Sequence, residues 1–223
     1  MQQVRLVATL VLVFSGLLVA PPGAHAVPGV CPPICDAIPD AAWPESGSIP
    51  LASVYRWPSL AGVAVTAPAP RFEFESWCVT PAPAADPRRY AVAARATVPD
   101  QDGQWNLQVQ VIHWRGDTLT GGQAALQVLE EARIALATCH LTGANASPSI
   151  TTSTVDQIGA VISDAGSRVM HTYLLADAAS STVVEIALWT TLPTQVDWRA
   201  VPDKRVFEAM AAPLCAAYAG SCR

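Results

Sequence analysis

The chain has 223 residues, of which 51% are apolar and only 14% are charged, and its formal net charge is −5. Intrinsically disordered chains combine low hydrophobicity with high net charge, so this composition excludes that class. The excess of 18 acidic over 13 basic residues argues against a nucleic-acid-binding protein, which usually carries a basic face. The length suits one domain with an appended irregular segment.

Residues 1–26 have the pattern of an export signal. Arg5 provides a positive start, and an apolar run follows from Leu6 to Ala20. The triplet Ala24-His25-Ala26 matches the small-x-small rule for signal peptidase, which makes Val27 the expected mature start. The run is short for a hydrocarbon core of roughly 30 Å, although retention as an N-terminal anchor is the alternative. We therefore predict a secreted or extracytoplasmic protein with no stable membrane insertion after cleavage.

Six cysteines all follow the predicted cleavage site: Cys31, Cys35, Cys78, Cys139, Cys215 and Cys222. An even number in an exported chain predicts three disulfides, and six cysteines allow fifteen pairings. Cys139 ends one predicted helix and Cys215 lies late in another, so Cys139–Cys215 is the best single pairing if both helices cover the same face of a sheet. The spacings lack the second close pair that a zinc site requires, and no metal is expected.

Residues 27–70 are rich in proline and have little periodicity, which makes long regular elements improbable. The aromatic residues Trp43, Tyr55 and Trp57 are poor linker residues. We therefore predict that this segment is an irregular arm packed on a domain that spans residues 71–223. A flexible mature N-terminus is the alternative.

From Arg71 onward, alternating apolar and polar residues predict strands at 71–79, 90–98 and 105–114, with a turn at Asp100–Gly103. A helix is expected from Thr120, as N-cap, to Cys139. Further strands are expected at about 149–155, 167–176 and 182–192, and a last helix at about 203–219. The clean alternation in 105–114 indicates a sheet with one buried and one polar face. The predicted class is α+β, an antiparallel sheet with two main helices on one face, stapled by disulfides.

Few residues suggest catalysis. His113 and His171 lie among apolar strand residues, which favours ordinary sheet histidines over a general base paired with a carboxylate. Glu73 and Glu75 share one face of the predicted strand 71–79, and a solvated strand face is simpler than a glycosidase pair. The sequence contains no nucleophile elbow and no phosphate-binding loop. No catalytic residue and no cofactor are predicted.

The polar face of the predicted sheet is the remaining candidate for a binding site. Amides, an arginine and tryptophan rings commonly line grooves that bind a polar small molecule or a peptide. An ordinary wet sheet face is the alternative. The predicted ligand-binding residues are Arg95, Gln108, Gln110, Trp114, Glu185 and Trp189.

Several features resemble mycobacterial exported proteins of unknown function. These are the signal segment, the use of arginine with Lys204 as the single lysine, the run Cys-Pro-Pro-Ile-Cys-Asp at 31–36 and the run Ala-Pro-Leu-Cys-Ala-Ala-Tyr at 212–218. More remotely, the helix ending at Cys139, the strand pair and the final helix with Cys215 resemble the extracellular sensor domain of mycobacterial receptor serine/threonine kinases. That resemblance implies a disulfide-stapled antiparallel sheet with a solvent-facing cleft. The chain contains no kinase, so it would imply a free-standing ligand-binding module.

The sequence therefore predicts a secreted, non-enzymatic binding or sensor-like domain of the bacterial cell envelope, whose partner is a small molecule or an envelope protein. One alternative is a cell-envelope hydrolase whose residues converge only in three dimensions. The other is an envelope protein-interaction module that uses exposed tryptophans.

Overall fold

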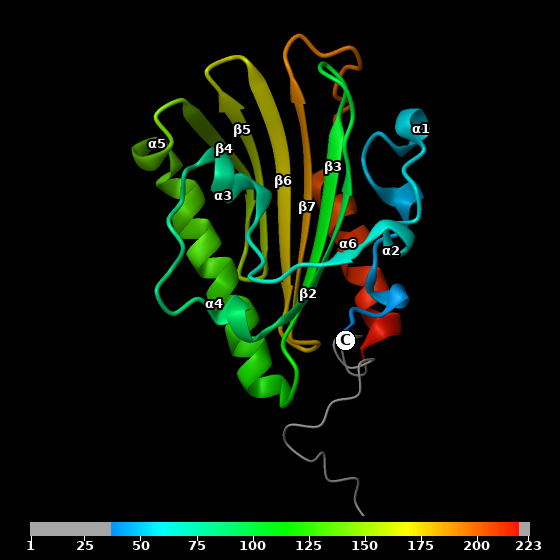
Figure 1. The fold of residues 1–223 in the computed structure, drawn as a ribbon, viewed down its shortest axis with the longest axis vertical. Coiled ribbons are helices and arrows are strands. Elements are labelled where there is room, and N and C mark those ends of the chain that lie inside the picture. The colour runs from blue at the N-terminus through cyan, green and yellow to red at the C-terminus, as the bar shows by residue number, and fades with distance from the viewer. Residues whose placement is uncertain (1–36, 219–223) are drawn as a thin grey trace, which may run out of the picture.

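The computed structural model describes residues 37–218, which form one seven-stranded antiparallel sheet flanked by helices (Figure 1). The strands are β1 (Val65–Thr66), β2 (Val92–Val98), β3 (Asn106–His113), β4 (Ala146–Ser153), β5 (Gln157–Asp164), β6 (Arg168–Asp177) and β7 (Thr182–Thr191). The α-helices are α1 (Ala52–Tyr55), α2 (Leu60–Val63), α3 (Glu73–Trp77), α4 (Thr118–Ala137), α5 (Cys139–Thr142) and α6 (Asp203–Ala217). Three short 3-10 helices are η2 (Asp40–Ala42), η3 (Ser46–Ser48) and η4 (Pro87–Tyr90).

The strand order is β1-β2-β3-β7-β6-β5-β4, so the last strand of the chain lies in the middle of the sheet. β2 and β3 form a hairpin, and α4 then leads to β4, from which the chain runs through β5 and β6 to β7. β7 returns to pair with β3, with Gln110 opposite Glu185 and Val111 opposite Val184. Residues 183–188 of this central strand are therefore buried on both sides.

One side of the sheet, here called the α4 face, is covered by α3 and α4. Its apolar residues include Ile112, Met170 and Leu174, and they pack in one cluster with Leu129 and Leu136 of α4. Two glycines allow the start of α4 to approach the β6–β7 hairpin closely. A Cβ added at Gly121 would lie 2.5 Å from the Ser181 hydroxyl, and one at Gly122 would lie 2.4 Å from the Ala178 carbonyl oxygen.

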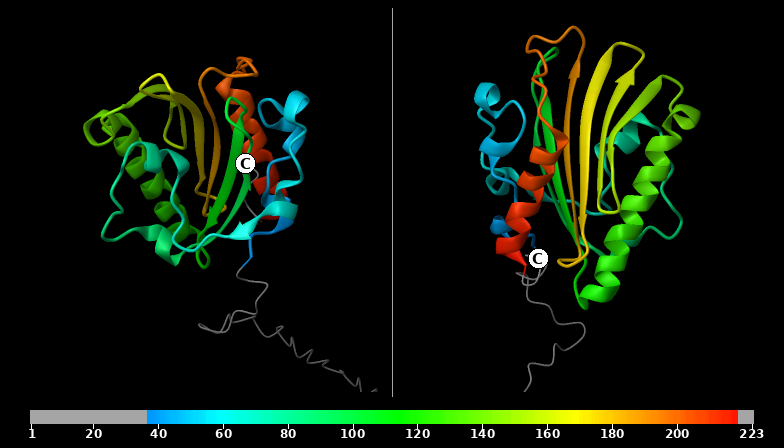
Figure 2. Two further views of the ribbon diagram at one scale, coloured as in Figure 1. Left: turned by 45° about the horizontal axis from the view of Figure 1, so that its top comes forward. Right: turned by 180° about the vertical axis from the view of Figure 1, so that it is seen from behind.

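The opposite side, here called the α6 face, is covered by α6 and by residues 38–64 (Figure 2). Its core joins alternate residues of the central strands to the apolar stripe of α6 and to buried side chains of the proline-rich segment. Trp57 of that segment is buried, its indole N–H donates to the Pro50 carbonyl oxygen at 3.0 Å, and its ring stacks on Tyr55 with centroids 4.6 Å apart. The segment is short on regular structure because of its prolines, but its aromatic side chains close this core.

The α+β class and the antiparallel sheet predicted from the sequence are confirmed. The prediction that both main helices cover one face is wrong, since α4 packs in the α4-face cluster and α6 in the α6-face cluster. The sequence pattern suggested one wet face because β3 alternates amides with apolar residues. Gln108 and Gln110 are buried instead, with hydrogen bonds from Gln110 to the Arg71 carbonyl oxygen of the covering chain and from Gln108 to Glu185.

Several elements differ from the sequence prediction in type or in bounds. Residues 71–79 alternate like a strand, but they contain the short helix α3, whose N-terminus is closed by the Glu75 carboxylate accepting from the Phe72 N–H at 2.6 Å. β5 was not predicted, because its sequence, Gln-Ile-Gly-Ala-Val-Ile-Ser-Asp, has a weak alternation that glycine interrupts. The helix predicted from Thr120 begins at Thr118, with Asp117 as the N-cap accepting from the Thr120 N–H at 2.7 Å.

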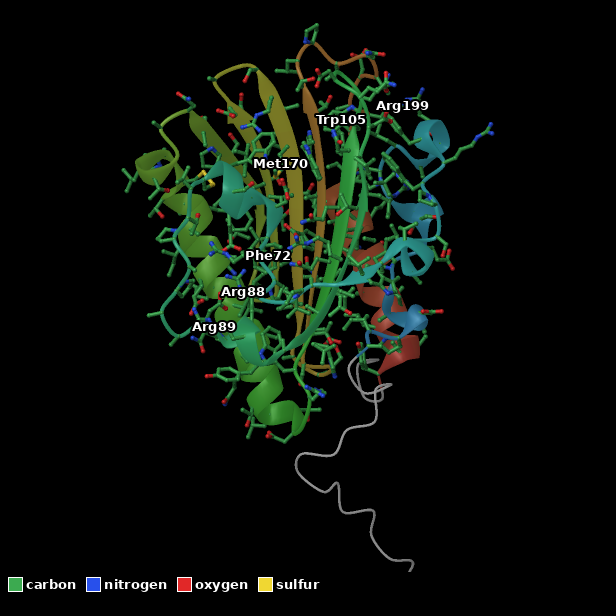
Figure 3. All side chains as sticks on the ribbon, viewed as in Figure 1. Phe72, Arg88, Arg89, Trp105, Met170 and Arg199 are labelled. Atoms are coloured by element: carbon green, nitrogen blue, oxygen red, sulfur yellow. A yellow bond between two sulfur atoms is a disulfide. The ribbon has the colours of Figure 1, made fainter. Side chains whose placement is uncertain are left out.

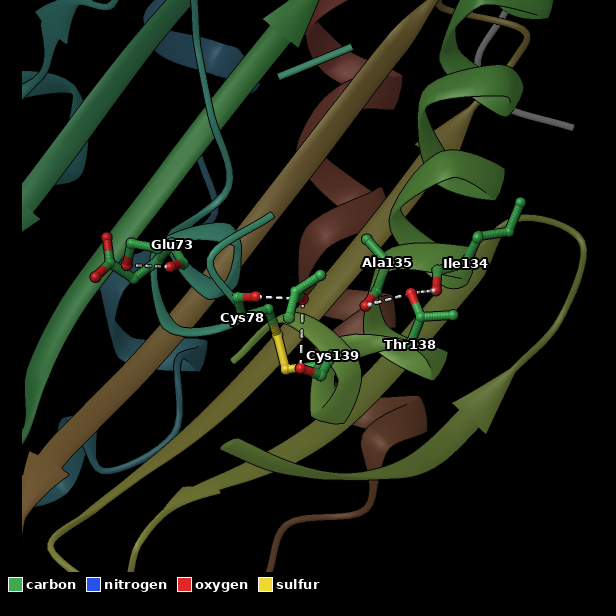
Figure 4. Close-up of a disulfide and its surroundings, with 8 residues drawn as sticks. Glu73, Cys78, Ile134, Ala135, Thr138 and Cys139 are labelled. Carbon is green, nitrogen blue, oxygen red and sulfur yellow. Dashed lines mark hydrogen bonds between the residues drawn. A yellow bond between two sulfur atoms is a disulfide. The ribbon is translucent and has the colours of Figure 1, made fainter. Parts of the chain in front are cut away.

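The disulfide pairing predicted from the sequence is also wrong. Cys139 is bonded to Cys78, which directly follows α3, and not to Cys215 (Figure 4). Cys139 and Cys215 belong to helices on opposite faces of the sheet, whereas α3 and α5 both lie on the α4 face. Cys215 is disulfide-bonded as well, so none of the three cysteines within residues 37–218 is a free thiol. Cys31, Cys35 and Cys222 lie outside the described residues.

Candidate functional site

A row of polar side chains crosses three neighbouring strands, β2, β3 and β7, on the α4 face. Arg95 of β2 lies opposite Gln110 of β3, which lies opposite Glu185 of β7. Gln108 lies two residues from Gln110 on the same strand and therefore on the same face. Period-two alternation thus brings together four of the six residues that the sequence analysis selected for ligand binding.

The chain leading into α3 covers this row and hydrogen-bonds to it. The Glu73 backbone N–H donates to Glu185 Oε1 at 2.6 Å, and Gln108 Nε2 donates to Glu185 Oε2 at 3.1 Å. Arg95 donates to Gln110 Oε1 from Nε at 3.0 Å and from Nη2 at 2.7 Å. The Arg71 carbonyl oxygen accepts from Arg95 Nη2 at 2.9 Å and from Gln110 Nε2 at 3.3 Å. We call Arg95, Gln108, Gln110, Glu185 and the backbone of residues 71 and 73 the polar floor.

Burial changes the acidity of the two carboxyl groups at the polar floor. Glu185 is 0% exposed, and desolvation raises its pKa to about 8 although the Glu73 N–H, Gln108 and Arg95 favour the charged form. The pKa of Glu73 is also raised, mainly by burial, while Arg95, Trp77 and Arg168 oppose that rise. At neutral pH the buried Glu185 is therefore largely protonated, and it places little charge beneath α3.

A second polar cluster anchors the segment that covers the floor. Arg88 donates to Glu75 from Nη1 at 2.7 Å and to Asp86 from Nη2 at 2.8 Å, and all three residues are buried. Burial disfavours the charge on Asp86, but the hydrogen bonds from Arg88 outweigh it and hold the pKa of Asp86 below its ordinary value. Arg71 adds a bond from Nε to Glu75 at 2.9 Å. The guanidinium of Arg88 also lies 5.0 Å from the centre of the Phe72 ring (Figure 3).

A groove of about 670 Å³ opens beside α3 and the polar floor. This volume is in the range of pockets that bind small molecules. Arginine and glutamate line it together with apolar and hydroxyl side chains. Its lining residues are Arg71, Phe72, Glu73, Glu75, Ser76, Val79, Thr80, Pro81 and Arg95.

Another hollow of about 710 Å³ lies where the start of α4 meets the β4–β5 turn and the β6–β7 hairpin. Asp156 and Asp177 contribute its charged side chains, and both accept local hydrogen bonds, from Thr154 and from the Ala179 N–H. The groove beside α3 is lined by Glu73, whose pKa is raised, and titratable groups with shifted pKa values concentrate at functional sites.

The two tryptophans predicted to bind ligand lie apart from the groove. Trp114 is only 7% exposed, and its indole N–H donates to the Pro87 carbonyl oxygen at 3.0 Å, so it is a core residue under η4. Trp189 is half-buried at the end of β7, in register with Asn106 and Met170. Neither side chain lines the groove.

The groove residues that the sequence analysis missed come from the segment misread as a strand. The sequence pattern placed Glu73 with Glu75 on one solvated strand face and did not predict it as a binding residue. In α3 the two carboxylates diverge, since Glu75 joins Arg88 while Glu73 faces Arg95 and Arg168. A signal for the helix was present, because Glu75 stands three residues after Phe72, where a side chain can cap the first turn.

The two histidines considered as general bases stack on aromatic rings instead. His113 stacks on Tyr218 with centroids 4.4 Å apart, and burial lowers its pKa. His171 stacks on Trp198 at 3.6 Å, and burial lowers its pKa to about 4 although Asp203 opposes the shift. Within residues 37–218, neither ring has a carboxylate as a hydrogen-bond partner.

No family model matches the chain, and the search of curated proteins found no match either. Among residues 37–218, no helix is both long and apolar enough to cross a bilayer.

Proposed function

We propose that this protein is an exported, non-enzymatic binding domain whose small polar ligand occupies the groove beside α3. The single observation that carries the proposal is the polar floor. Of its four side chains, Arg95 lines the groove, whereas Gln108, Gln110 and Glu185 are buried beneath it. Hydrogen bonds to Gln110 and to the Arg71 carbonyl oxygen hold Arg95 in place before a ligand binds, which limits the conformational entropy lost on binding. The groove beside it adds charged, hydroxyl and apolar side chains to one surface.

Burying a polar group costs free energy that its hydrogen bonds only offset, so a sheet that buries Gln108, Gln110 and Glu185 gains little stability from them. An apolar core would have sufficed, as it does on the α6 face. This cost supports a role in recognition for the polar floor. The aromatic stacking of His113 and His171 supports a protein that does not use them as general bases.

The proposal is tested by a binding screen. A library of small polar metabolites would be added to the ¹⁵N-labelled protein, and amide shifts would be followed by NMR. We expect a binder to shift the signals of Glu73, Ser76 and Arg95. Arg95→Gln should weaken that binder about tenfold or more, because it removes a cation at the groove. Arg89→Gln is the matched control, since Arg89 is exposed and lies outside the groove.

Two results would contradict the proposal. One is a library in which no compound shifts the groove signals. The other is a hydrolytic activity that His113→Ala or His171→Ala abolishes, which would favour the cell-envelope hydrolase. An interaction module that uses Trp114 has less support, because that side chain is buried.

Export is part of the proposal and has its own test. Residues 1–26 lie outside the described residues, and the disulfide between Cys78 and Cys139 supports an oxidising compartment. Mass spectrometry of the protein from the culture medium should show an N-terminus at Val27. A full-length chain retained in the cell envelope would indicate an uncleaved anchor instead.

A further inference from the structure

The apolar end of the groove contains a backbone conformation that its residue rarely adopts. Val79 has φ +52°, in the left-handed region, where β-branched residues are genuine outliers. The Thr80 N–H donates to the Glu75 carbonyl oxygen at 2.9 Å and the Val79 N–H to the Ser76 carbonyl oxygen at 3.4 Å. These two bonds form a Schellman C-cap for α3, in which Val79 stands where glycine is usual. Glycine would relieve the strain, so the valine side chain needs another explanation.

Burial does not explain the valine, because Val79 is 66% exposed. Its side chain faces the groove together with Pro81. Strained residues that packing does not require cluster at ligand-binding sites. An exposed isopropyl group in this position gives the groove an apolar contact that glycine would remove.

The opposite part of the groove holds two guanidinium groups in fixed positions. Arg71 donates from Nε to Glu75 and from Nη2 to the Thr80 carbonyl oxygen at 2.8 Å. Arg95 uses Nε and Nη2, and its bond to the Arg71 carbonyl oxygen keeps the two residues adjacent. In the described part of the chain, Nη1 of either arginine forms no hydrogen bond. Rigid guanidinium groups with free donors are suited to binding a carboxylate.

Glu73 lies between these cations and the exposed end of α3. Its backbone N–H is bound to Glu185, so the position of its carboxyl group is constrained, and that group lines the groove. The other nearby carboxylate, on Glu75, is already bound by Arg88 and Arg71. Glu73 is therefore the acid that can meet a ligand ammonium group.

We infer that the groove binds an α-amino acid with an apolar side chain, whose carboxylate meets Arg71 and Arg95, whose ammonium group meets Glu73 and whose side chain contacts Val79 and Pro81. The inference rests on the proposed binding function, and it names the ligand class. A zwitterion matches the groove because cations and an acid line it side by side. Val79 selects for side-chain size.

Four probe compounds test this assignment by calorimetric titration. L-leucine carries all three groups, glycine lacks the side chain, 4-methylpentanoate lacks the amine and 3-methylbutylamine lacks the carboxylate. We expect L-leucine to bind and each of the other three to bind about tenfold or more weakly, since each leaves part of the site unpaired. Binding of 4-methylpentanoate as tight as that of L-leucine would overturn the role of Glu73. Failure of L-leucine to bind would overturn the inference.

Two variants and a control separate binding from structure. Val79→Gly should raise the melting temperature, because strain is removed, and should reduce the preference for L-leucine over glycine to about threefold or less. Glu73→Gln should abolish the preference for L-leucine over 4-methylpentanoate. Val155→Ala changes an exposed valine outside the groove and should change neither. Val79→Gly with an unchanged preference would overturn the role of Val79.

The metabolite screen separates this inference from the broader proposal. If L-leucine fails but another compound shifts the signals of Glu73 and Arg95, the ligand class is wrong and the binding function stands. If no compound shifts them, both are wrong.

Discussion

The two faces of the sheet are buried by different kinds of side chain. On the α6 face, β3, β6 and β7 present a largely apolar surface that His171 interrupts, and α6 with residues 38–64 covers it. On the α4 face, only the part beneath α4 is apolar. The part beneath α3 buries two glutamines and a glutamic acid in a hydrogen-bonded network with the half-buried Arg95.

The difference separates stability from recognition. Burying apolar area is the main favourable contribution to folding, so the α6 face should provide most of the stability of the domain. The network beneath α3 contributes little net stability, because each polar group exchanges bonds with water for bonds within the protein. It holds α3 and the groove in one arrangement. Three substitutions test this comparison.

The largest effect is expected on the α6 face. Phe207 is buried, and its ring meets Tyr173 edge-on with centroids 5.8 Å apart. Phe207→Ala should lower the free energy of unfolding by about 3–5 kcal/mol, measured by urea denaturation, because it leaves a cavity. Glu208→Ala, at the exposed neighbouring position, should change it by less than about 0.5 kcal/mol. A loss below about 1 kcal/mol for Phe207→Ala would contradict the assignment of stability to this face.

A smaller effect is expected from the ion cluster that anchors α3. Arg88→Gln leaves the buried carboxylates of Glu75 and Asp86 without their main cation. The free energy of unfolding should fall by about 3 kcal/mol in the same assay, because the two buried carboxylates would remain without a cation to offset their desolvation. Arg89→Gln serves as the exposed control. Equal stability of the two variants would mean that the cluster contributes nothing.

The third effect depends on pH, is smallest near pH 5 and concerns Glu185. The folded protein keeps the Glu185 proton up to about pH 8, whereas an ordinary glutamic acid, with a pKa of 4.5, loses it much earlier in the unfolded chain. Between these values the unfolded state binds fewer protons, so the stability of the native protein falls as pH rises. Glu185→Gln removes this titration. At pH 9 the variant should therefore be the more stable protein.

Melting temperatures from pH 5 to pH 9 measure this difference. Near pH 5, where Glu185 is protonated in the folded state, the two proteins should have similar stability. If the melting temperatures of the two proteins changed in parallel from pH 5 to pH 9, the pKa of Glu185 would not be raised in the folded protein.

Local sequence patterns predicted the elements with strong periodicity. The apolar stripes of α4 and α6 repeat every three to four residues, and β3 alternates from Asn106 to Val111. In each of these elements the spacing of apolar residues matches one type of secondary structure. The pattern also selected Arg95, Gln108, Gln110 and Glu185 for one polar face. It failed at residues 71–79, where five helical residues are too few to show a period and two buried phenylalanines imitate alternation.

The sequence by itself determined the α+β class, the antiparallel sheet, most of the long elements and four members of the polar floor. Only the tertiary structure decided that α4 and α6 lie on opposite faces, that Cys78 pairs with Cys139, and that α3 converts a polar sheet face into a groove. The physical reason is the separation along the chain of the residues that interact. Periodicity reports the environment of a residue relative to its neighbours in the chain. The return of β7 to a place beside β3 depends on contacts between residues about 75 positions apart, for which local pattern carries no signal.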